Sequence, residues 1–180
     1  YNQPPITNEL YNKGAKLRMA ASTRLEVKGV DANVYNVNNA KIHIKDNATM
    51  NIEGDLFNTS SLIDQLQGVL VVDSNIVNEF GTIQQTTGRI TTTKGGLTNK
   101  NNSVFQSQGI VNLKTDLYNT VSSQLRLDSL LYISGNWYNS ARDSIRIAGG
   151  VKCSVIFNGT STQYVGGDVE TKFENVHIIN

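Results

Sequence analysis

The triplet Leu10-Tyr11-Asn12 recurs in varied form along the whole chain. Each version has an apolar residue, then a residue that is usually aromatic or β-branched, then an asparagine. The nine versions are Leu10-Tyr11-Asn12, Val34-Tyr35-Asn36, Leu56-Phe57-Asn58, Ile76-Val77-Asn78, Leu97-Thr98-Asn99, Leu117-Tyr118-Asn119, Trp137-Tyr138-Asn139, Ile156-Phe157-Asn158 and Ile178-Ile179-Asn180. Successive asparagines lie 19 to 24 residues apart, and such regular spacing indicates a chain built from repeated units.

The hydrophobic pattern between the triplets has a period of two, which predicts half-buried β-strands. It is clearest in five segments, Lys16–Met19, Arg24–Lys28, Lys41–Lys45, Gln124–Asp128 and Ser144–Ile147. Units of about 21 residues with two or three strands each predict an all-β, single-domain, right-handed parallel β-helix (β-solenoid) of about eight coils. We assign residues 1–9 to an N-terminal extended arm and residues 10–180 to the solenoid domain.

One segment, Ser60–Leu66, has a spacing compatible with a helical turn. A short inserted helix and an irregular corner both fit this segment. The remaining windows favour strands and turns, in keeping with 22 Asn, 16 Thr, 14 Ser and 15 Gly in the chain.

The recurring asparagines are expected to form a ladder along one corner of the solenoid. Asparagine tolerates the left-handed backbone of a tight corner, and its amide can donate to one neighbouring coil and accept from the other. The predicted ladder comprises Asn12, Asn36, Asn58, Asn78, Asn99, Asn119, Asn139 and Asn158. The residues that precede six of them would form a stacked aromatic row, Tyr11, Tyr35, Phe57, Tyr118, Tyr138 and Phe157. For any single asparagine, turn preference alone is the competing explanation.

Composition and charge exclude several classes of function. The chain has 16 Lys and Arg against 15 Asp and Glu, a net charge of +1, so we expect no nucleic-acid partner. One cysteine and two histidines are too few for a cysteine- or histidine-built metal centre, and we expect no metal and no cofactor. No apolar run reaches the roughly 20 residues of a membrane-spanning helix, so we expect no membrane insertion.

The strand register predicts which side chains face inward. The expected core comprises Leu17, Val27, Ile42, Ile44, Ile52, Leu113, Leu125, Leu127, Ile133, Ile145, Ile147 and Val155. Trp137 occupies the triplet position of Leu56 and Leu117, which favours the core over a sugar-binding surface. Cys153 is expected to be a buried small hydrophobic residue.

A carbohydrate-active β-helix is the main alternative to a structural role, either a polysaccharide lyase or hydrolase or a tailspike-like glycan binder. Such enzymes need two or three carboxylates close together. Asp55 and Asp116 share one corner position but lie three coils apart, about 14 Å. The densest acidic group, Asp64, Asp73 and Glu79, is more typical of a solvated surface. We therefore expect no catalytic residues.

The two histidines support the same expectation. His43 lies between Ile42 and Ile44, and His177 lies between Val176 and Ile178. Both side chains are therefore expected to point outward from strands rather than to act in catalysis.

Val151–Gly167 is similar to V-x-F-N-G-[ST]-x-x-Q-x-[IV]-x-G, and Phe173–Asn180 to F-x-N-[LV]-x-I-N. In these segments the last thirty residues resemble a unit that recurs in large secreted cell-surface β-solenoid (adhesin-like) proteins of the Bacteroidota. Gly14–Leu17 and Ile52–Asp55 are similar to the first coils of the same proteins. The resemblance implies export across both membranes, often by the type IX system, and an adhesive or scaffolding role without a catalytic motif.

We expect an extracellular, cell-surface structural or adhesive protein whose copies assemble head to tail into a filament or fibre, with surface glycans as further partners. The strand pattern continues to the last residues, and open strand edges invite pairing with another chain. The Pro4-Pro5 arm could lie along a neighbouring subunit or cap its own chain. The expected assembly interface comprises Tyr1, Pro4, Pro5, Ile6, Val176, Ile178 and Ile179. Truncation from a longer surface protein is the competing explanation for a pattern that runs to Asn180.

Overall fold

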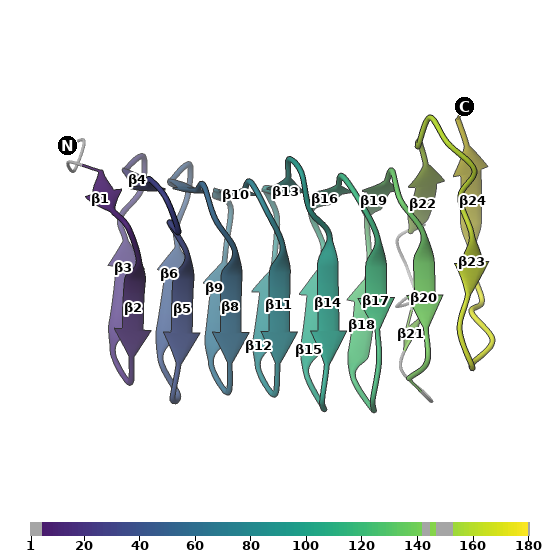
Figure 1. Cartoon of the computed structure of the whole chain (residues 1–180), viewed down its shortest axis with the longest axis horizontal. Coiled ribbons are helices and arrows are strands. Elements are labelled where there is room, and N and C mark those ends of the chain that lie inside the picture. Colours follow the sequence, from purple (N-terminus) through teal and green to yellow (C-terminus); the bar gives the residue numbers. More distant parts are fainter. Residues whose placement is uncertain (1–4, 142–144, 147–152, 180) are drawn as a thin grey trace.

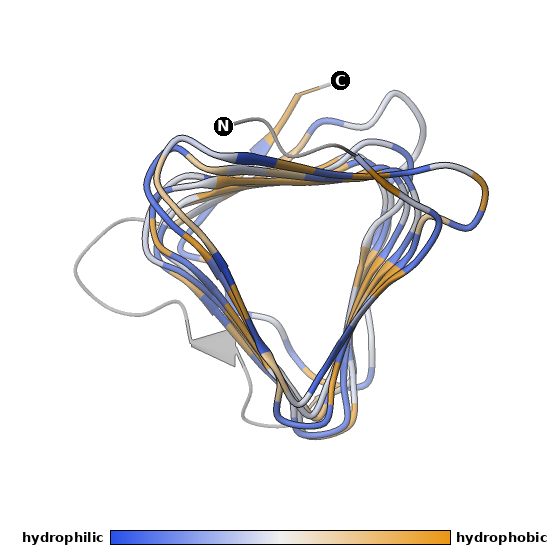
Figure 2. Ribbon diagram, turned by 90° about the vertical axis from the view of Figure 1, so that its left-hand side faces the viewer, coloured by the Kyte–Doolittle hydropathy of each residue, from blue (hydrophilic) through white to orange (hydrophobic). Residues whose placement is uncertain are grey.

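The chain winds into a triangular tube whose three walls are parallel β-sheets, here called A, B and C (Figure 1, Figure 2). The computed structural model describes residues 5–141, 145–146 and 153–179. Each coil as far as β21 contributes one strand to each wall, in the order A, B, C, and the described chain ends with β22, β23 and β24 in the order A, B, A. Seen from the N-terminal end, the chain passes clockwise through these walls as the coils recede, so the solenoid is right-handed as predicted (Figure 2). The described residues include no helix, and therefore none long and apolar enough to cross a membrane.

The strands are short, mostly four residues, and are numbered along the chain. Sheet A contains β1 (Ile6–Thr7), β4 (Arg24–Lys28), β7 (Thr49–Ile52), β10 (Val69–Val72), β13 (Arg89–Thr92), β16 (Ile110–Leu113), β19 (Leu130–Ile133), β22 (Ser154–Phe157) and β24 (Asn175–Ile178). Sheet B contains β2 (Leu10–Lys13), β5 (Val34–Val37), β8 (Leu56–Thr59), β11 (Ile76–Glu79), β14 (Leu97–Lys100), β17 (Leu117–Asn119), β20 (Trp137–Asn139) and β23 (Val165–Gly166). Sheet C contains β3 (Lys16–Met19), β6 (Lys41–Ile44), β9 (Leu62–Gln65), β12 (Thr82–Gln85), β15 (Val104–Ser107), β18 (Gln124–Leu127) and β21 (Ile145–Arg146).

Seven of the nine repeated triplets, from Leu10-Tyr11-Asn12 to Trp137-Tyr138-Asn139, lie in strands of sheet B. They pair in register from coil to coil, so that Asn78 lies beside Asn58 on one side and Asn99 on the other. Side chains alternate between the inside and the outside of the tube along each strand. Register and alternation together give every coil the same inward positions, and the core is a stack of these layers.

The core follows the predicted register. Nine of the predicted residues are buried in one hydrophobic cluster: Val27, Ile42, Ile44, Ile52, Leu113, Leu125, Leu127, Ile133 and Val155. Leu17 is partly buried and packs against the same cluster. The side chains of Ile145 and Ile147 lie outside the described part of the chain. Trp137 is 1% exposed, which confirms its assignment to the core.

The segment Ser60–Leu66 forms neither a helix nor an irregular corner, and both expectations were wrong. Its central residues form β9, which pairs with β6 on one side and β12 on the other. Ile63 and Gln65 point inward and are buried. The hydrogen bonds of two neighbouring coils thus outweigh a weak local helical spacing.

The two ends of the tube differ from the regular coils. Ile6 and Thr7, in the expected N-terminal arm, pair with β4 of their own chain as β1, and Ile6 packs against the core. Near the other end, Phe173 packs edge-on against Trp137 and Phe157, with ring centroids 5.0 and 6.2 Å away. Phe173 therefore covers apolar residues that another regular coil would otherwise cover.

Several non-glycine residues at the corner between sheets B and C have a left-handed backbone. They are Asn38, Asn39, Ser60, Phe80, Asn101, Asn102, Val121 and Ser122, with φ between 49° and 60°. Asparagine adopts this conformation readily, whereas a bulky or β-branched residue does so at a cost. Phe80 and Val121 are thus unfavourable residue types for the left-handed backbone of this corner, and both are exposed.

Candidate functional site

The asparagine ladder runs inside the tube along sheet B. The Nδ2 atom of each asparagine donates to Oδ1 of the next, at 2.7 to 3.0 Å, from Asn12 through Asn139. Every member is buried. A buried amide without partners is costly, so each asparagine is stable here because its neighbours satisfy it. The predicted ladder is confirmed for these seven residues.

The ladder asparagines lie within strands rather than at a left-handed corner as we expected. Their amides still support the corner, because Nδ2 also donates to a main-chain carbonyl in the sheet C strand of the next coil. Asn78 donates in this way to Val104, and Asn99 to Gln124, both at 2.9 Å. In the later coils a serine hydroxyl adds a bond, as when Ser103 donates to Asn99 Oδ1 at 2.7 Å. The ladder therefore ties sheet B to sheet C.

Asn158 does not belong to the ladder, and its assignment was wrong. Strand β20 pairs with β23, which places Tyr138 beside Gly166 and the next position at Gly167. Asn158 instead follows β22 in sheet A, is exposed, and accepts a hydrogen bond from Ser134 Oγ at 3.0 Å. Its 19-residue distance from Asn139 matches the period, but the chain reaches a different wall of the tube after that distance.

The aromatic row exists in two separate stacks on the outside of sheet B. Tyr11, Tyr35 and Phe57 stack at centroid distances of 4.5 and 5.0 Å, and Tyr118 stacks on Tyr138 at 4.8 Å. In the coils between the two stacks this position is held by Val77 and Thr98, which interrupt the row. Phe157 is not part of it, because it lies in sheet A and is buried. Rings stacked in this way turn one face to a neighbouring ring, and Tyr35 has a ring on both faces.

Asp55 and Asp116 belong to a second ladder, at the corner between sheets A and B. Asp55 Oδ1 accepts the backbone N–H of Asn75 at 2.7 Å, and Asp116 Oδ1 accepts that of Asn136 at 2.6 Å. In the two intervening coils this position is held by Asn75 and Gly96, and Asn75 Oδ1 accepts the N–H of Gly96. Asp116 also accepts from the Tyr118 hydroxyl at 2.9 Å, and this bond raises the pKa of Tyr118. These aspartates hold successive coils together.

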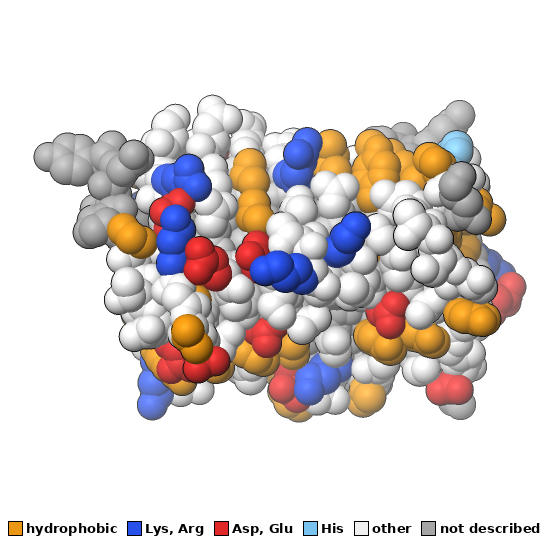
Figure 3. Space-filling view, turned by 45° about the horizontal axis from the view of Figure 1, so that its top comes forward, with side chains coloured by type: hydrophobic (Ala, Val, Ile, Leu, Met, Phe, Trp, Pro, Cys, Tyr) orange, Lys and Arg blue, Asp and Glu red, His pale blue; other side chains and the backbone are white. Residues whose placement is uncertain are grey.

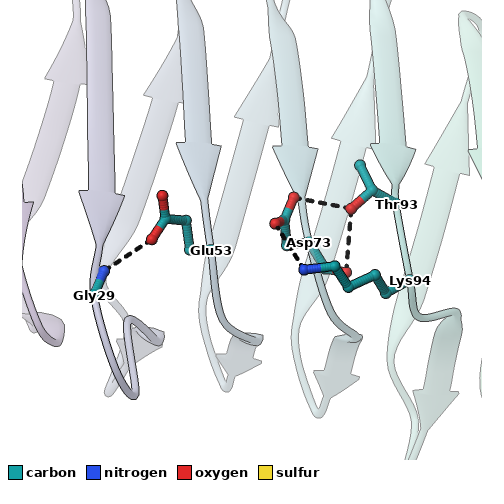
Figure 4. A network of polar contacts seen from close by, with 5 residues as sticks. All are labelled: Gly29, Glu53, Asp73, Thr93 and Lys94. Atoms are coloured by element: carbon teal, nitrogen blue, oxygen red, sulfur yellow. Dashed lines mark hydrogen bonds and ion pairs between the residues drawn. The ribbon is translucent and has the colours of Figure 1, made fainter.

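The densest acidic group of the sequence is spread over three walls. Asp64 lies on β9 of sheet C, Asp73 directly after β10 of sheet A, and Glu79 on β11 of sheet B. Asp73 accepts from Thr93 Oγ1 at 2.9 Å and pairs with Lys94 at 3.3 Å, as Figure 4 shows. Within the described part of the chain, no three acidic, histidine or cysteine side chains gather in a way that could hold a metal ion.

Figure 4 also shows Glu53, which lies one coil before Asp73 in sheet A. Its carboxylate accepts the backbone N–H of Gly29 in the preceding coil, at 2.9 Å. Glu53 and Asp73 thus bond toward opposite ends of the rod. Both carboxylates serve contacts between coils.

The face formed by sheets A and B carries side chains of both charges (Figure 3). Glu26 on β4 pairs with Arg24 at 2.6 Å and with Lys28 at 2.9 Å. The hydrogen bond from Lys28, together with the positive charge of both neighbours, lowers the pKa of Glu26. Opposite charges are therefore neutralised locally on this face.

The outer side of sheet C has a polar group that the sequence did not reveal. His43 Nδ1 lies 3.0 Å from Asp64 Oδ2, and Gln84 Nε2 donates to Asp64 Oδ1 at 3.0 Å. His43 points outward as predicted, although it is half-buried. His177 is exposed. The three bonded residues occupy one register position in three successive coils, so coil stacking alone brings them together.

Cys153 is a buried thiol, as its position in the sequence predicted. It is 1% exposed. Burial first, and then the negative charges of Glu174 and Asp128, raise its pKa to about 11. A thiol with this pKa is protonated at neutral pH and is a poor nucleophile.

The predicted assembly residues lie at the two edges of sheet A. Tyr1 and Pro4 lie outside the described residues, Pro5 is exposed, and Ile6 is half-buried in β1. At the other edge, β24 pairs with β22 in a register that places Val176 and Ile178 beside the buried residues Val155 and Phe157. Val176 is nevertheless 43% exposed, Ile178 72% and, just beyond the strand, Ile179 59%.

Comparisons with protein-family models, with curated proteins and with solved structures gave no match.

Proposed function

We propose that this protein is a structural, adhesive rod at the cell surface, outside the cell, and that copies join head to tail through the edges of sheet A. The role is mechanical rather than catalytic. A stiff tube with repeated walls separates two points in space and presents long flat faces, which is what a fibre subunit needs.

Edge strand β24 is the observation that carries this proposal. Among the described residues its outer edge has no strand partner, and the apolar side chains of Val176, Ile178 and, just beyond the strand, Ile179 are exposed. Natural proteins usually protect such an edge with charge, proline or a covering loop. A second copy that placed its β1 next to β24 would continue the parallel ladder and cover Val176 and Ile178.

The arrangement of the acidic side chains supports a non-catalytic role. The carboxylates that the sequence singles out, Asp55, Asp64, Asp73, Glu79 and Asp116, lie on different walls or in different coils. All five are engaged in hydrogen bonds that join coils. Hydrolysis or elimination of a polysaccharide needs two or three free carboxylates around one bond.

Electron microscopy and light scattering of the purified chain test the assembly. Ile179 N–H donates to Phe157 of β22, so the alternation along a parallel strand points the N–H of Ile178 to the free edge. Ile178→Pro removes this donor without removing an internal bond, and it should abolish filaments while circular dichroism stays unchanged. The matched control Ile178→Val keeps both the N–H and an apolar side chain and should assemble.

Head-to-tail assembly is tested first on the unmodified chain. Particles that grow with concentration and appear as thin rods of repeated units are the expected result. A monodisperse monomer at high concentration, with no filaments in the microscope, would refute head-to-tail assembly.

A further inference from the structure

A hollow of about 270 Å³ opens at the corner between sheets B and C in the N-terminal half of the rod. Residues from three successive coils line it. They include Asn39 and Lys41 from one coil, Ser60 and Ser61 from the next, and Phe80 and Thr82 from the third. The hollow thus presents an amide, hydroxyls, an ammonium group and an aromatic ring to one small volume.

Phe80 is held in this hollow at a conformational cost. Its φ is 52°, and its side chain is 55% exposed. The equivalent corner residues of the two preceding coils are Asn39 and Ser60, small polar residues that fit the left-handed region better. A strained, solvent-exposed aromatic residue lowers the stability of the free protein, and such residues concentrate at binding sites. Unlike the stacked rings of sheet B, Phe80 has no ring partner among the described residues.

Ser61 supplies an unused hydrogen-bonding group beside Phe80. It lines the hollow and is 7% exposed, and its Oγ has no partner among the described residues. Ser103 and Ser123 occupy the same position in later coils, and their hydroxyls donate to the ladder residues Asn99 and Asn119. Unsatisfied buried hydroxyls are uncommon in native proteins. Rotation about its Cα–Cβ bond would turn the Ser61 hydroxyl toward a ligand in the hollow.

A strip of cations continues from the hollow across the outer side of sheet C. The basic strip comprises Lys16 and Arg18 on β3, Lys41 on β6 and Lys45 directly after it. Lys16 and Lys41 are paired in register, about 4.8 Å apart along the rod. None of the four has an ion-pair partner within the described residues, whereas Arg24, Lys28, Lys94 and Lys100 on other walls do. The acid of the next coil, Asp64, is already bonded to His43 and Gln84.

We propose that the hollow and the basic strip together bind an anionic polysaccharide, a polymer whose sugars carry carboxylate or sulfate groups. Phe80 packs against the apolar face of one sugar ring, and Ser61 and Asn39 bond to its hydroxyls. Lys41 and Lys16 pair with acidic groups of this sugar and the next, so that the polymer follows the rod axis. This inference deepens the proposed adhesive role and rests on it.

Binding of the intact chain to three polymers tests the chemistry. Calorimetry with polygalacturonate, dextran sulfate and neutral dextran should give binding to at least one of the two anionic polymers and none to dextran. Comparison of polygalacturonate with dextran sulfate shows whether carboxylate or sulfate is preferred. Affinity should fall as salt rises, because the contacts are exposed ion pairs. Equal binding to dextran, or no binding to either anionic polymer, would overturn the proposal.

Two variants separate binding from folding. Phe80→Asn removes the ring and relieves the strained backbone, so the fold should be at least as stable while affinity falls about tenfold or more. Val121→Asn is the matched control, since Val121 is equally strained and exposed but does not line the hollow. It should leave the affinity unchanged. If Phe80→Asn binds as well as the unmodified chain, the hollow is not the site.

Charge removal tests the basic strip in the same way. Lys41→Gln should weaken binding about fivefold, and Lys16→Gln combined with it should weaken binding further. Lys94→Gln on sheet A is the control and should have no effect. Filament formation by Ile178→Pro and by these variants is measured separately. A chain that assembles but binds no anionic polymer would refute this inference alone, and one that binds but stays monomeric would refute the assembly alone.

Discussion

Replacement of Asn99 by alanine measures what the buried ladder contributes to stability. The Asn99 side chain makes four hydrogen bonds: it accepts from Asn78 and Ser103 and donates to Asn119 and Gln124. In Asn99→Ala two buried donors, on Asn78 and Ser103, lose their acceptor. Each unsatisfied buried donor costs about 1–3 kcal/mol, so we expect a loss of about 4 kcal/mol in the free energy of unfolding. That is a large part of the roughly 5–15 kcal/mol that stabilises a typical domain.

The same substitution at the first ladder residue should cost far less. Asn12 donates to Asn36 and to the carbonyl of Lys41, and no described group donates to it. Asn12→Ala therefore leaves two acceptors and no orphaned donor, and we expect a loss of about 1 kcal/mol. The ladder thus predicts that the loss in free energy of unfolding on Asn→Ala depends strongly on the position of the asparagine in the ladder.

Urea unfolding followed by circular dichroism and by Trp137 fluorescence gives both values, provided that the two transitions coincide. Asn158→Ala serves as the control outside the ladder and should change stability by less than about 0.5 kcal/mol. If Asn99→Ala and Asn12→Ala cost the same, the hydrogen bonds of the ladder do not determine the stability of the rod.

Three further results are expected. Val121→Asn should stabilise the fold by about 1 kcal/mol in urea, because asparagine adopts the left-handed backbone that valine resists; a destabilised variant would contradict this. Gly167→Ala should cost at least about 2 kcal/mol, since its Cβ would clash with the carbonyl oxygen of Asn139 at a φ of 126°. Gly166→Ala is its control and should be neutral in the same titration, because nothing lies within 4 Å of the added Cβ. Cys153 should resist Ellman's reagent at pH 8, where a thiol with a pKa of about 11 is almost wholly protonated, and should react once urea opens the coils; rapid labelling of the folded chain would show that the thiol is accessible.

The period, the strands and the core register could be predicted from the sequence because all three repeat. A residue type that returns at the same point of each unit, such as Asn78 and then Asn99, must meet its equivalents when the units stack in register. Alternation along each strand then separates inside from outside without any knowledge of distant contacts. For the same reason Trp137 could be placed in the core from its position in the triplet.

The parts that escaped prediction depend on contacts without a repeating signal. The last sheet B strand, Val165–Gly166, resembles none of the triplets, so the neighbour of Asn139 could not be found by similarity. The bond between His43 and Asp64 joins outward polar residues, a position where almost any polar pair is compatible with the fold. Prediction of the hollow beside Phe80 would have required the backbone angle at this corner, which the types of the neighbouring residues do not determine.

The asparagine ladder has one more property, its direction. Every amide from Asn12 to Asn119 donates toward the C-terminal end, and every amide from Asn36 to Asn139 accepts from the N-terminal side, so the side-chain dipoles add along the rod axis. Aligned hydrogen bonds polarise one another and strengthen the row. The tube consequently has a net side-chain dipole along its axis, in addition to the direction of its coils. A copy added in the same sense would extend the polarised row, whereas two copies meeting by their N-terminal faces would oppose acceptor to acceptor, a contact that the ladder itself discourages.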